Sequence, residues 1–341
     1  MSYEFLQIIW FILIAVLWIG FFFLEGFDFG VGMLLPFLGK SDAEKRAIIN
    51  TIGPHWDGNE VWLLVAGGAT FAAFPHWYAT LFSGFYPALF LLLVGLIIRG
   101  VGFEFRSKSK NEQWRSLWDW CIFAGSLIPS LLLGVAFANM AKGIPIDGSM
   151  TYTGNLFTLL NPYGLIGGLT LVALFILHGA NFLNLKLSEE VLDRSRRITP
   201  IIWVIGFVFL AGFVIATALV TDGYTQKGTL ILVAPLAALV FLLAGGLLNR
   251  SGREGWSFAT TGLAIILAVV TYFHVMFPRV MVSSTNPEFS LTITNASSTA
   301  YTLNVMSIVA LIFVPIVLMY QIWSYWVFRK RISPNSKGLH Y

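Results

Sequence analysis

Ionisable side chains inside long apolar segments are the residues of this sequence with the clearest chemical potential. Such groups cost about 2.5–3.5 kcal/mol on insertion scales, and by default they mark a pathway or a buried partner. The set comprises Glu25, Asp28, Asp57, Glu60, Arg99 and Glu104. Glu25 and Asp28 are three residues apart, as are Asp57 and Glu60, so we expect each pair to share one face of its helix.

The five carboxyls admit two interpretations. They lie on three consecutive expected helices that alternate in direction, which brings all five toward the cytoplasmic end. In one interpretation the carboxyls and trapped water pass protons into the membrane. In the other they are counter-ions for Arg99, Arg106 and nearby lysines, or helix-end caps. Asp57 is the stronger functional candidate because it lies in the polar run 53–60, and such backbone at membrane depth must be buried in protein or line a wet cavity.

The histidines offer a second kind of chemistry. Haem ligation needs a histidine and a second axial ligand at the same depth. Depth alone permits two pairs, His55 with His178 and His76 with His274. A lone histidine near the end of a span more often bonds to backbone or lipid headgroups. Cys121 is the only cysteine, and no Cys-x-x-Cys-His, Walker A or dinucleotide-binding motif is present, so nothing else indicates catalysis.

The composition indicates the solvent around these residues. The 341 residues are 57% hydrophobic and 11% charged, with a mean hydropathy of +0.77, whereas soluble domains carry roughly 25% charged residues. We therefore expect an all-α integral membrane protein surrounded by lipid. The net charge of +4 fits the usual excess of Lys and Arg in cytoplasmic loops, not binding to nucleic acid. Residues 6–24 have no preceding Lys or Arg and no following cleavage motif, so we interpret them as a retained first helix.

About nine segments have the length and apolarity of transmembrane helices. They are residues 6–34, 59–74, 80–103, 118–140, 163–184, 200–220, 229–248, 257–277 and 302–327. The second is short as drawn and should begin earlier, near Trp56. Lys and Arg number 17 in the odd-numbered loops and the tail but 3 in the even-numbered loops. This asymmetry places the N-terminus outside and the C-terminus in the cytoplasm.

These spans form one membrane domain over residues 1–341. We expect a first four-helix bundle at 5–140, a second at 163–277, a peripheral ninth helix at 302–327 and a cytoplasmic tail at 328–341. The motif Glu-Gly-Phe-Asp-Phe at 25–29 returns as His-Gly-Ala-Asn-Phe at 178–182, which suggests a duplicated four-helix unit. The loop 278–301 is rich in Ser, Thr and Asn, and its segment 289–294 has the pattern of a short strand.

From the residues alone, the function is proton handling or transport across a membrane. A proton-coupled secondary transporter is the natural competitor, with a site at the membrane midplane on broken helices. Glycine pairs at 67–68, 167–168 and 245–246 agree with it, although glycines also let helices pack closely. The carboxyls, however, cluster at one end and not at the midplane.

A series of motifs occurs in a fixed order from about residue 20 to residue 325. They are Glu-Gly-Phe-Asp-Phe-Gly-Val-Gly-Met-Leu-Leu-Pro at 25–36, Gly-Pro-His-Trp-Asp-Gly-Asn-Glu-Val-Trp at 53–62, Ala-Phe-Pro at 73–75, Gly-Phe-Tyr-Pro at 84–87, Arg-Gly-Val-Gly-Phe-Glu-Phe-Arg at 99–106, Trp-Asp-Trp at 118–120, Gly-Val-Ala-Phe at 134–137, Leu-Asn-Pro at 160–162 and Thr-Leu-Asn-Val-Met at 302–306. The series resembles subunit II of the cytochrome bd-type quinol oxidases, and the segment 53–62 is highly specific.

The resemblance implies a heterodimer with a larger subunit I in a bacterial or archaeal cytoplasmic membrane. The complex oxidises membrane quinol and reduces dioxygen to water. Two haem b and one haem d belong to subunit I, so this chain should bind no haem or metal, although some members hold a structural quinone. Asp57 matches the aspartate thought to belong to a proton route from the cytoplasm, and acids matching Glu25, Asp28 and Glu104 recur in relatives. A small accessory subunit is a further expected partner of some complexes.

Overall fold

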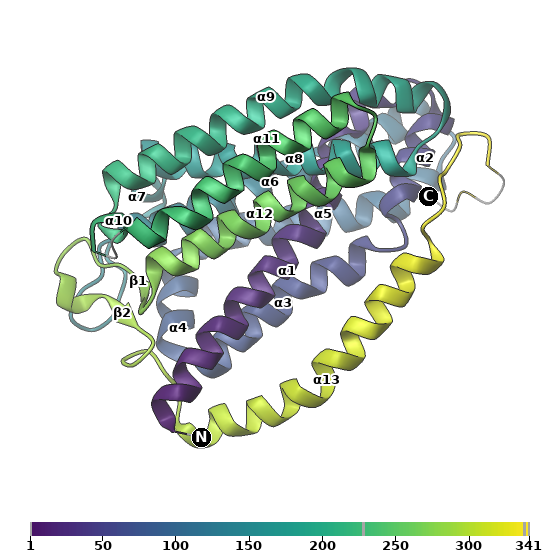
Figure 1. The fold of residues 1–341 in the computed structure, drawn as a ribbon. Helices are drawn as coiled ribbons and strands as arrows, with labels where there is room; N and C mark the ends of the chain where they lie inside the picture. Colours follow the sequence, from purple (N-terminus) through teal and green to yellow (C-terminus); the bar gives the residue numbers. More distant parts are fainter. Residues whose placement is uncertain (1, 227–228, 337–338, 340–341) are drawn as a thin grey trace.

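The computed structural model describes residues 2–226, 229–336 and 339, and long helices run side by side through most of it (Figure 1). The α-helices are α1 (Tyr3–Leu38), α2 (Asp42–Ile52), α3 (Trp56–Ala73), α4 (Pro75–Gly84), α5 (Tyr86–Phe105), α6 (Glu112–Lys142), α7 (Leu156–Leu159), α8 (Pro162–Lys186), α9 (Glu189–Val220), α10 (Gly223–Gln226), α11 (Val233–Arg250), α12 (Glu254–Met276) and α13 (Ala300–Val327). The expected all-α membrane class is confirmed.

Eight helices in the described part of the chain are long and apolar enough to cross a membrane: α1, α5, α6, α8, α9, α11, α12 and α13. They coincide with eight of the nine expected spans. The remaining span corresponds to α3, which begins at Trp56 as expected but has Asp57, Asn59 and Glu60 in its first turns. α3 packs along α1, so the protein shelters part of this polar start.

The contacts between helices fall into two groups. α1 contacts α3 and α6, and α5 packs on α6; α8 packs on α9 and α12, and α11 packs on α12 and α9. α1, α6 and α8 join the groups through extensive contacts with one another. This pattern agrees with two four-helix units, whose limits at 5–140 and 163–277 stay a prediction.

α1 and α8 cross where backbone meets backbone. A Cβ atom on Gly30 would collide with the carbonyl oxygen of Phe175, and one on Gly179 would lie 2.5 Å from the carbonyl carbon of Gly30. Glycine permits this approach because it has no side chain. Gly30 and Gly179 lie in or beside the two repeated motifs, so the crossing fixes the Glu25 segment of α1 against α8.

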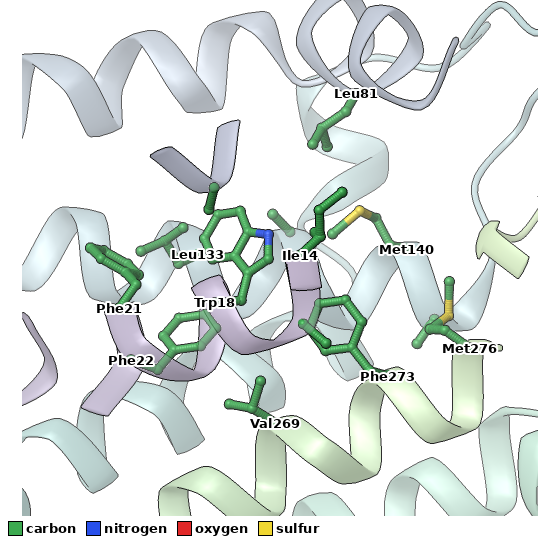
Figure 2. Packing of buried hydrophobic residues seen from close by; sticks show 14 of the residues in the cluster. Ile14, Trp18, Phe21, Phe22, Leu81, Leu133, Met140, Val269, Phe273 and Met276 are labelled. Carbon is green, nitrogen blue, oxygen red and sulfur yellow. The ribbon is translucent and has the colours of Figure 1, made fainter. Parts of the chain in front are cut away.

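Aromatic side chains fill the core around the first half of α1. Trp18 lies edge-on to Phe137 of α6 with ring centres 4.8 Å apart, and Phe22 lies edge-on to the same ring at 5.1 Å. Figure 2 shows Trp18 between Leu133 of α6 and Phe273 of α12, with Phe22 beside Trp18. Pairs of this geometry contribute about 0.5–1.5 kcal/mol beyond their buried area, so this core holds α1 in the middle of the bundle.

The expected outer end carries a small two-stranded sheet, β1 (Arg279–Met281) and β2 (Leu291–Thr292), which pair antiparallel. The strand predicted over 289–294 is therefore shorter than expected, because Pro287–Phe289 forms a 3-10 turn. The same segment ties two helices together. Ser298 N donates to Ala73 O at the end of α3, and Tyr3 Oη of α1 donates to Ser298 O, each at 2.8 Å.

α13 runs apart from the other helices and approaches them at its two ends (Figure 1). Leu303 is its only buried residue among those described. At the outer end, Trp10 Nε1 of α1 donates to Leu303 O at 3.1 Å and to Ser307 Oγ at 3.0 Å. At the other end, Gln321 and Tyr325 reach α3. The long middle of α13 is exposed on this chain.

An ion pair outside the spans joins α2 to α9. Glu44 Oε2 lies 2.5 Å from Arg194 Nη2 and accepts from the backbone N–H of Lys40 at 2.7 Å and of Ser41 at 3.3 Å. Burial acts to raise the pKa of Glu44, but the hydrogen bonds from Arg194, Lys40 and Ser41 outweigh it, and the pKa lies below its ordinary value. The pair connects the two groups of helices at the end where α2 lies.

Candidate proton-transfer site

Three helices converge on one buried guanidinium. Arg99 of α5 is fully buried, and its Nη1 donates to Glu25 Oε1 of α1 and lies 3.8 Å from Glu60 Oε2 of α3. The guanidinium carbon is 4.6 Å from the ring centre of Phe29 and 5.4 Å from that of Phe103. Two aromatic faces and two carboxylates therefore hold the cation in place.

A glycine on the neighbouring helix makes this convergence possible. A Cβ atom on Gly125 of α6 would lie 2.7 Å from Arg99 Cβ and 3.0 Å from Arg99 N. Gly125 thus lets α5 approach α6 closely, while the side chain of Arg99 extends to Glu25 on α1. The local sequence therefore positions the guanidinium through packing as well as through charge.

Asp28 joins the cluster through an amide. It lies one turn beyond Glu25 on α1 and is fully buried. Asn59 Nδ2 of α3 donates to Asp28 Oδ2 at 2.7 Å, and Asn59 Oδ1 accepts from Gln321 Nε2 at 3.1 Å and from Tyr325 Oη at 2.9 Å. α1, α3, α5 and α13 therefore all contribute to one polar cluster.

Five buried polar atoms of this cluster have no hydrogen-bond partner among the described residues. They are Glu25 Oε2, Asp28 Oδ1, Glu60 Oε2, Arg99 Nε and Arg99 Nη2. Buried polar atoms in native proteins are nearly always bonded, either to protein or to ordered water. Three acceptors and two donors in one cluster favour water as the link between the carboxyls.

The other two predicted carboxyls lie outside the buried cluster. Asp57, in the first turn of α3, and Glu104, near the end of α5, are both exposed on this chain. Neither forms a hydrogen bond or ion pair with the residues that the structure describes. The structure thus gathers Glu25, Asp28 and Glu60 and leaves Asp57 and Glu104 at the surface; the proton-transfer role of all five stays a prediction.

Arg106 is not a counter-ion of these carboxyls, contrary to one of the two expectations. Its Nε donates to Asp119 Oδ1 at 2.6 Å, and its Nη1 donates to Asp42 Oδ1 at 3.0 Å. Lys45 Nζ donates to Asp119 Oδ2 at 2.9 Å. This separate ionic network holds α2 against α5 and α6, so the counter-ion interpretation applies to Arg99 alone.

The structure describes the surroundings of four of the five histidines. His178 is fully buried, its Nε2 lies 3.1 Å from the carbonyl oxygen of Phe23, and its ring stacks on Phe258 at 4.5 Å. His55 stacks on Tyr325 at 4.1 Å with the rings nearly parallel. The Nε2 atom of His178 is therefore already engaged by a backbone carbonyl. His76 and His274 are exposed.

Sequence reasoning missed the polar residues that complete the cluster. Asn59 lies in the polar run 53–60 but was not singled out, and Gln321 and Tyr325 lie in an apolar span more than 250 residues away in sequence. A signal existed, because an uncharged polar side chain such as Gln321 within a span usually bonds to another helix. The sequence could not say which helix that was.

Comparisons with known proteins place the whole chain in one family. The family model described as "Cytochrome bd terminal oxidase subunit II" matches residues 6–328. The chain is 47% identical over 328 residues to cytochrome bd ubiquinol oxidase subunit 2 of Bacillus subtilis strain 168, covering 95% of this chain and 96% of that one. It is 40% identical over 368 residues to cytochrome bd-I ubiquinol oxidase subunit 2 of Escherichia coli K12, covering 98% and 97%.

A solved structure supports the fold independently. A chain of the bd oxidase from Geobacillus thermodenitrificans superposes with a TM-score of 0.77 at 16% identity, over 94% of this chain and 97% of that chain. At this identity the likeness speaks for the fold alone. The family match and the close relatives decide the identity: the chain belongs to the family of subunit II of the cytochrome bd terminal oxidases.

Proposed function

We propose that this chain assembles with a haem-bearing first subunit and supplies part of the proton route for oxygen reduction. As a member of its family, the chain is a subunit of a quinol:oxygen oxidoreductase in a respiratory membrane. The alternative expectation, a proton-coupled secondary transporter, has no support, since the matched family and the relatives named above are oxidase subunits.

The haems of the complex belong, in this proposal, to the partner subunit. Haem would supply the electron transfer and the binding of dioxygen. This chain would instead provide a scaffold and protons. Support comes from the buried His178, whose Nε2 lies 3.1 Å from the carbonyl oxygen of Phe23 and is engaged there.

The partner would cover the exposed apolar faces of α3, α5 and α13. Leu64 of α3 is 69% exposed, Tyr86 of α5 is 65% exposed and Leu311 of α13 is 79% exposed. Lipid covers such faces in any membrane protein, but Asp57 and Glu104 border the same faces, and carboxylates are costly in lipid. A heterodimer in which the partner surrounds these two carboxyls removes that cost. An accessory subunit stays an expectation.

The observation that carries the proton route is the cluster of three buried carboxyls around one guanidinium. Glu25, Asp28 and Glu60 would leave two negative charges uncompensated if all three were ionised beside Arg99. Uncompensated charge in a low-dielectric interior costs several kcal/mol per ion. The cluster therefore favours holding protons, and its unpaired oxygens provide acceptors for the next transfer.

Asp57 would be the entry to this cluster. It is exposed at the start of α3, and Glu60 follows one turn further along the same helix face. Glu104, exposed near the end of α5, would support the entry electrostatically. In the orientation expected from the loop charges, this end of the bundle faces the cytoplasm, where the protons for water formation originate.

Asp57→Asn tests the proposal because it keeps the shape and removes the titrating group. We expect the complex to retain its haem content while oxygen consumption falls about tenfold or more. Asp57→Glu should keep more activity than Asp57→Asn, and Glu60→Gln should be milder. Glu288→Gln, an exposed carboxyl at the opposite end, is the matched control and should behave as wild type.

Two outcomes would contradict this role. If Asp57→Asn loses haem and dissociates from its partner, Asp57 is a structural anchor of the interface. If a fully assembled Asp57→Asn complex consumes oxygen at the wild-type rate, Asp57 has neither role.

A further inference from the structure

We infer that Gln321 and Tyr325 of α13 are positioning residues: they orient the amide of Asn59 and so determine which oxygen of Asp28 is favoured to carry a proton. The inference rests on the proposed proton role of the buried cluster and assigns a regulator to that cluster. It follows from the direction of each hydrogen bond in a short chain of side chains that ends at Asp28.

This series of hydrogen bonds begins at the indole of Trp62, whose N–H can only donate a hydrogen bond. Trp62 Nε1 of α3 donates to Gln321 Oε1 of α13 at 3.0 Å. Because a tryptophan N–H has no acceptor capacity, the atom of Gln321 that faces it must be the amide oxygen. The nitrogen of the same amide then faces Asn59, at 3.1 Å from Asn59 Oδ1. One donor-only group thus fixes the orientation of the whole Gln321 amide.

The same logic fixes Asn59. Its Oδ1 accepts from Gln321 Nε2 and also from Tyr325 Oη at 2.9 Å, so both bonds require an oxygen at this position. The amide nitrogen must point the other way, to Asp28 Oδ2 at 2.7 Å and, more distantly, to Leu24 O at 3.5 Å. Asn59 therefore presents a donor to Asp28 and cannot present an acceptor.

This orientation divides the two oxygens of Asp28. Oδ2 accepts a hydrogen bond from Asn59, and a carbonyl oxygen accepts better than a hydroxyl oxygen, so a proton on Asp28 is favoured on Oδ1. Asp28 Oδ1 is buried and accepts no hydrogen bond from a donor among the described residues, while the carboxyl of Glu25 faces Asp28. Proton exchange at Asp28 is thereby favoured at Oδ1, the oxygen not bonded to α3.

Tyr325 is itself held rigidly. Its ring stacks on His55 with centres 4.1 Å apart and an angle of 9° between the planes, and it meets Phe27 edge-on at 6.3 Å. The hydroxyl is thus aimed at Asn59 by packing on both α1 and the segment before α3. Gln321 and Tyr325 are four residues apart, so they share the face of α13 that reaches the cluster.

α13 is otherwise almost unburied in this chain, since Leu303 alone is buried. Its exposed middle is available to the partner subunit, while Gln321 and Tyr325 contact Asn59. A change in the position of α13 would therefore reach Asp28 through two side-chain bonds. In this way assembly with the partner is coupled to the proton cluster.

The test uses the assembled complex and the double variant Gln321→Leu/Tyr325→Phe. It removes both donors to Asn59 Oδ1 and keeps the ring that stacks on His55. The titratable and charged groups facing Asp28 are Glu25, Glu60, Arg99 and Tyr325. Only Tyr325 among them is changed, and its hydroxyl is uncharged near neutral pH.

We expect the double variant to retain its haems, to turn over about tenfold more slowly at neutral pH, and to show a pH–rate profile moved upward by about one unit. Freed from its two donors, Asn59 can turn its oxygen toward Asp28, and a carboxyl that donates to that oxygen keeps its proton to higher pH. The carboxyl C=O band assigned to Asp28 by Asp28→Asn should also shift in the infrared difference spectrum.

The controls separate orientation from folding. Tyr325→Phe alone should shift the pH profile and the infrared band less than the double variant does, because Gln321 still donates to Asn59. Ser307→Ala removes a hydrogen bond of α13 at its other end and should change neither the pH profile nor the infrared band.

Each failure has its own signature. If Asp28→Asn turns over normally, the proposed use of Asp28 is wrong. If Asp28→Asn is slow while the double variant keeps the wild-type rate, profile and band, the orienting role is refuted and the proton role stands. If the double variant loses haem, Trp62→Phe removes the orienting N–H together with part of the ring that packs on Gly20. The same two readouts then decide: a shifted profile and band support the inference, and unchanged ones overturn it.

Discussion

Replacing Arg99 by methionine would show how strongly the buried cluster depends on its one cation. Methionine keeps an unbranched apolar stem between Phe29 and Phe103, although a shorter one than arginine, and removes the partner of Glu25 and Glu60. Breaking a buried ion pair by removing one partner costs about 3–5 kcal/mol. We place Arg99→Met in this range because Arg99 is fully buried and Glu25 is fully buried beside it.

A second substitution should restore most of that loss. In Arg99→Met/Glu25→Gln the uncompensated carboxylate is gone, so the double variant should be more stable than Arg99→Met alone, with a coupling of about 2 kcal/mol or more. The assay is the amount of intact, haem-containing complex that survives a temperature series in detergent, measured by size exclusion.

The reasoning has a clear point of failure and a matched control. Arg115 pairs with Asp42 at 2.9 Å but is partly exposed, so Arg115→Met should cost less than about 1 kcal/mol. If Arg99→Met is as stable as Arg115→Met, or if Glu25→Gln gives no rescue, the buried pair of Arg99 and Glu25 does not stabilise the complex as we expect.

Two further outcomes follow from groups outside the cluster. Because the pKa of Glu44 lies below its ordinary value of 4.5, its ionised form stabilises the fold above that value. The thermal midpoint of wild type should therefore exceed that of Glu44→Gln at pH 7, and the difference should shrink as the pH falls below 4.5; a constant difference would show that Arg194 does not stabilise the ionised form. For topology, in a chain with Cys121→Ser, a cysteine at Thr294 should react with an impermeant reagent from outside and one at Lys110 only after permeabilisation, and the reverse would overturn the orientation.

The long apolar segments were predictable because few backbone conformations are stable in lipid. A span must satisfy its own backbone, so length and apolarity suffice to locate helices such as α8 and α12. α3 was the difficult case because Asp57, Asn59 and Glu60 lower its hydropathy, and only its packing on α1 explains a helix there. Local composition predicts an apolar span, whereas tertiary contacts decide whether a segment with polar residues in its first turns is also part of a helix.

The candidate site was predictable in membership but not in geometry. A spacing of three places Glu25 and Asp28 on one face, yet it cannot say that Arg99 lies between Glu25 and Glu60 while Asp57 stays at the surface. The position of Arg99 depends on Gly125, which allows α5 to approach α6. The link from Gln321 to Asn59 joins residues 262 positions apart, and no periodicity within one helix can predict such a contact.

The crossing of Gly30 and Gly179 also limits how this subunit can move. No side chains lie between the two backbones, so α1 and α8 are in direct contact at this crossing. If either helix slid along the other, Gly30 would collide with Phe175. The segment of α1 that carries Glu25 and Asp28 lies directly beside this crossing. Adjustments during turnover are therefore expected in elements outside this crossing, and α13, which contacts the other helices at its two ends, is the least buried of the eight spanning helices described.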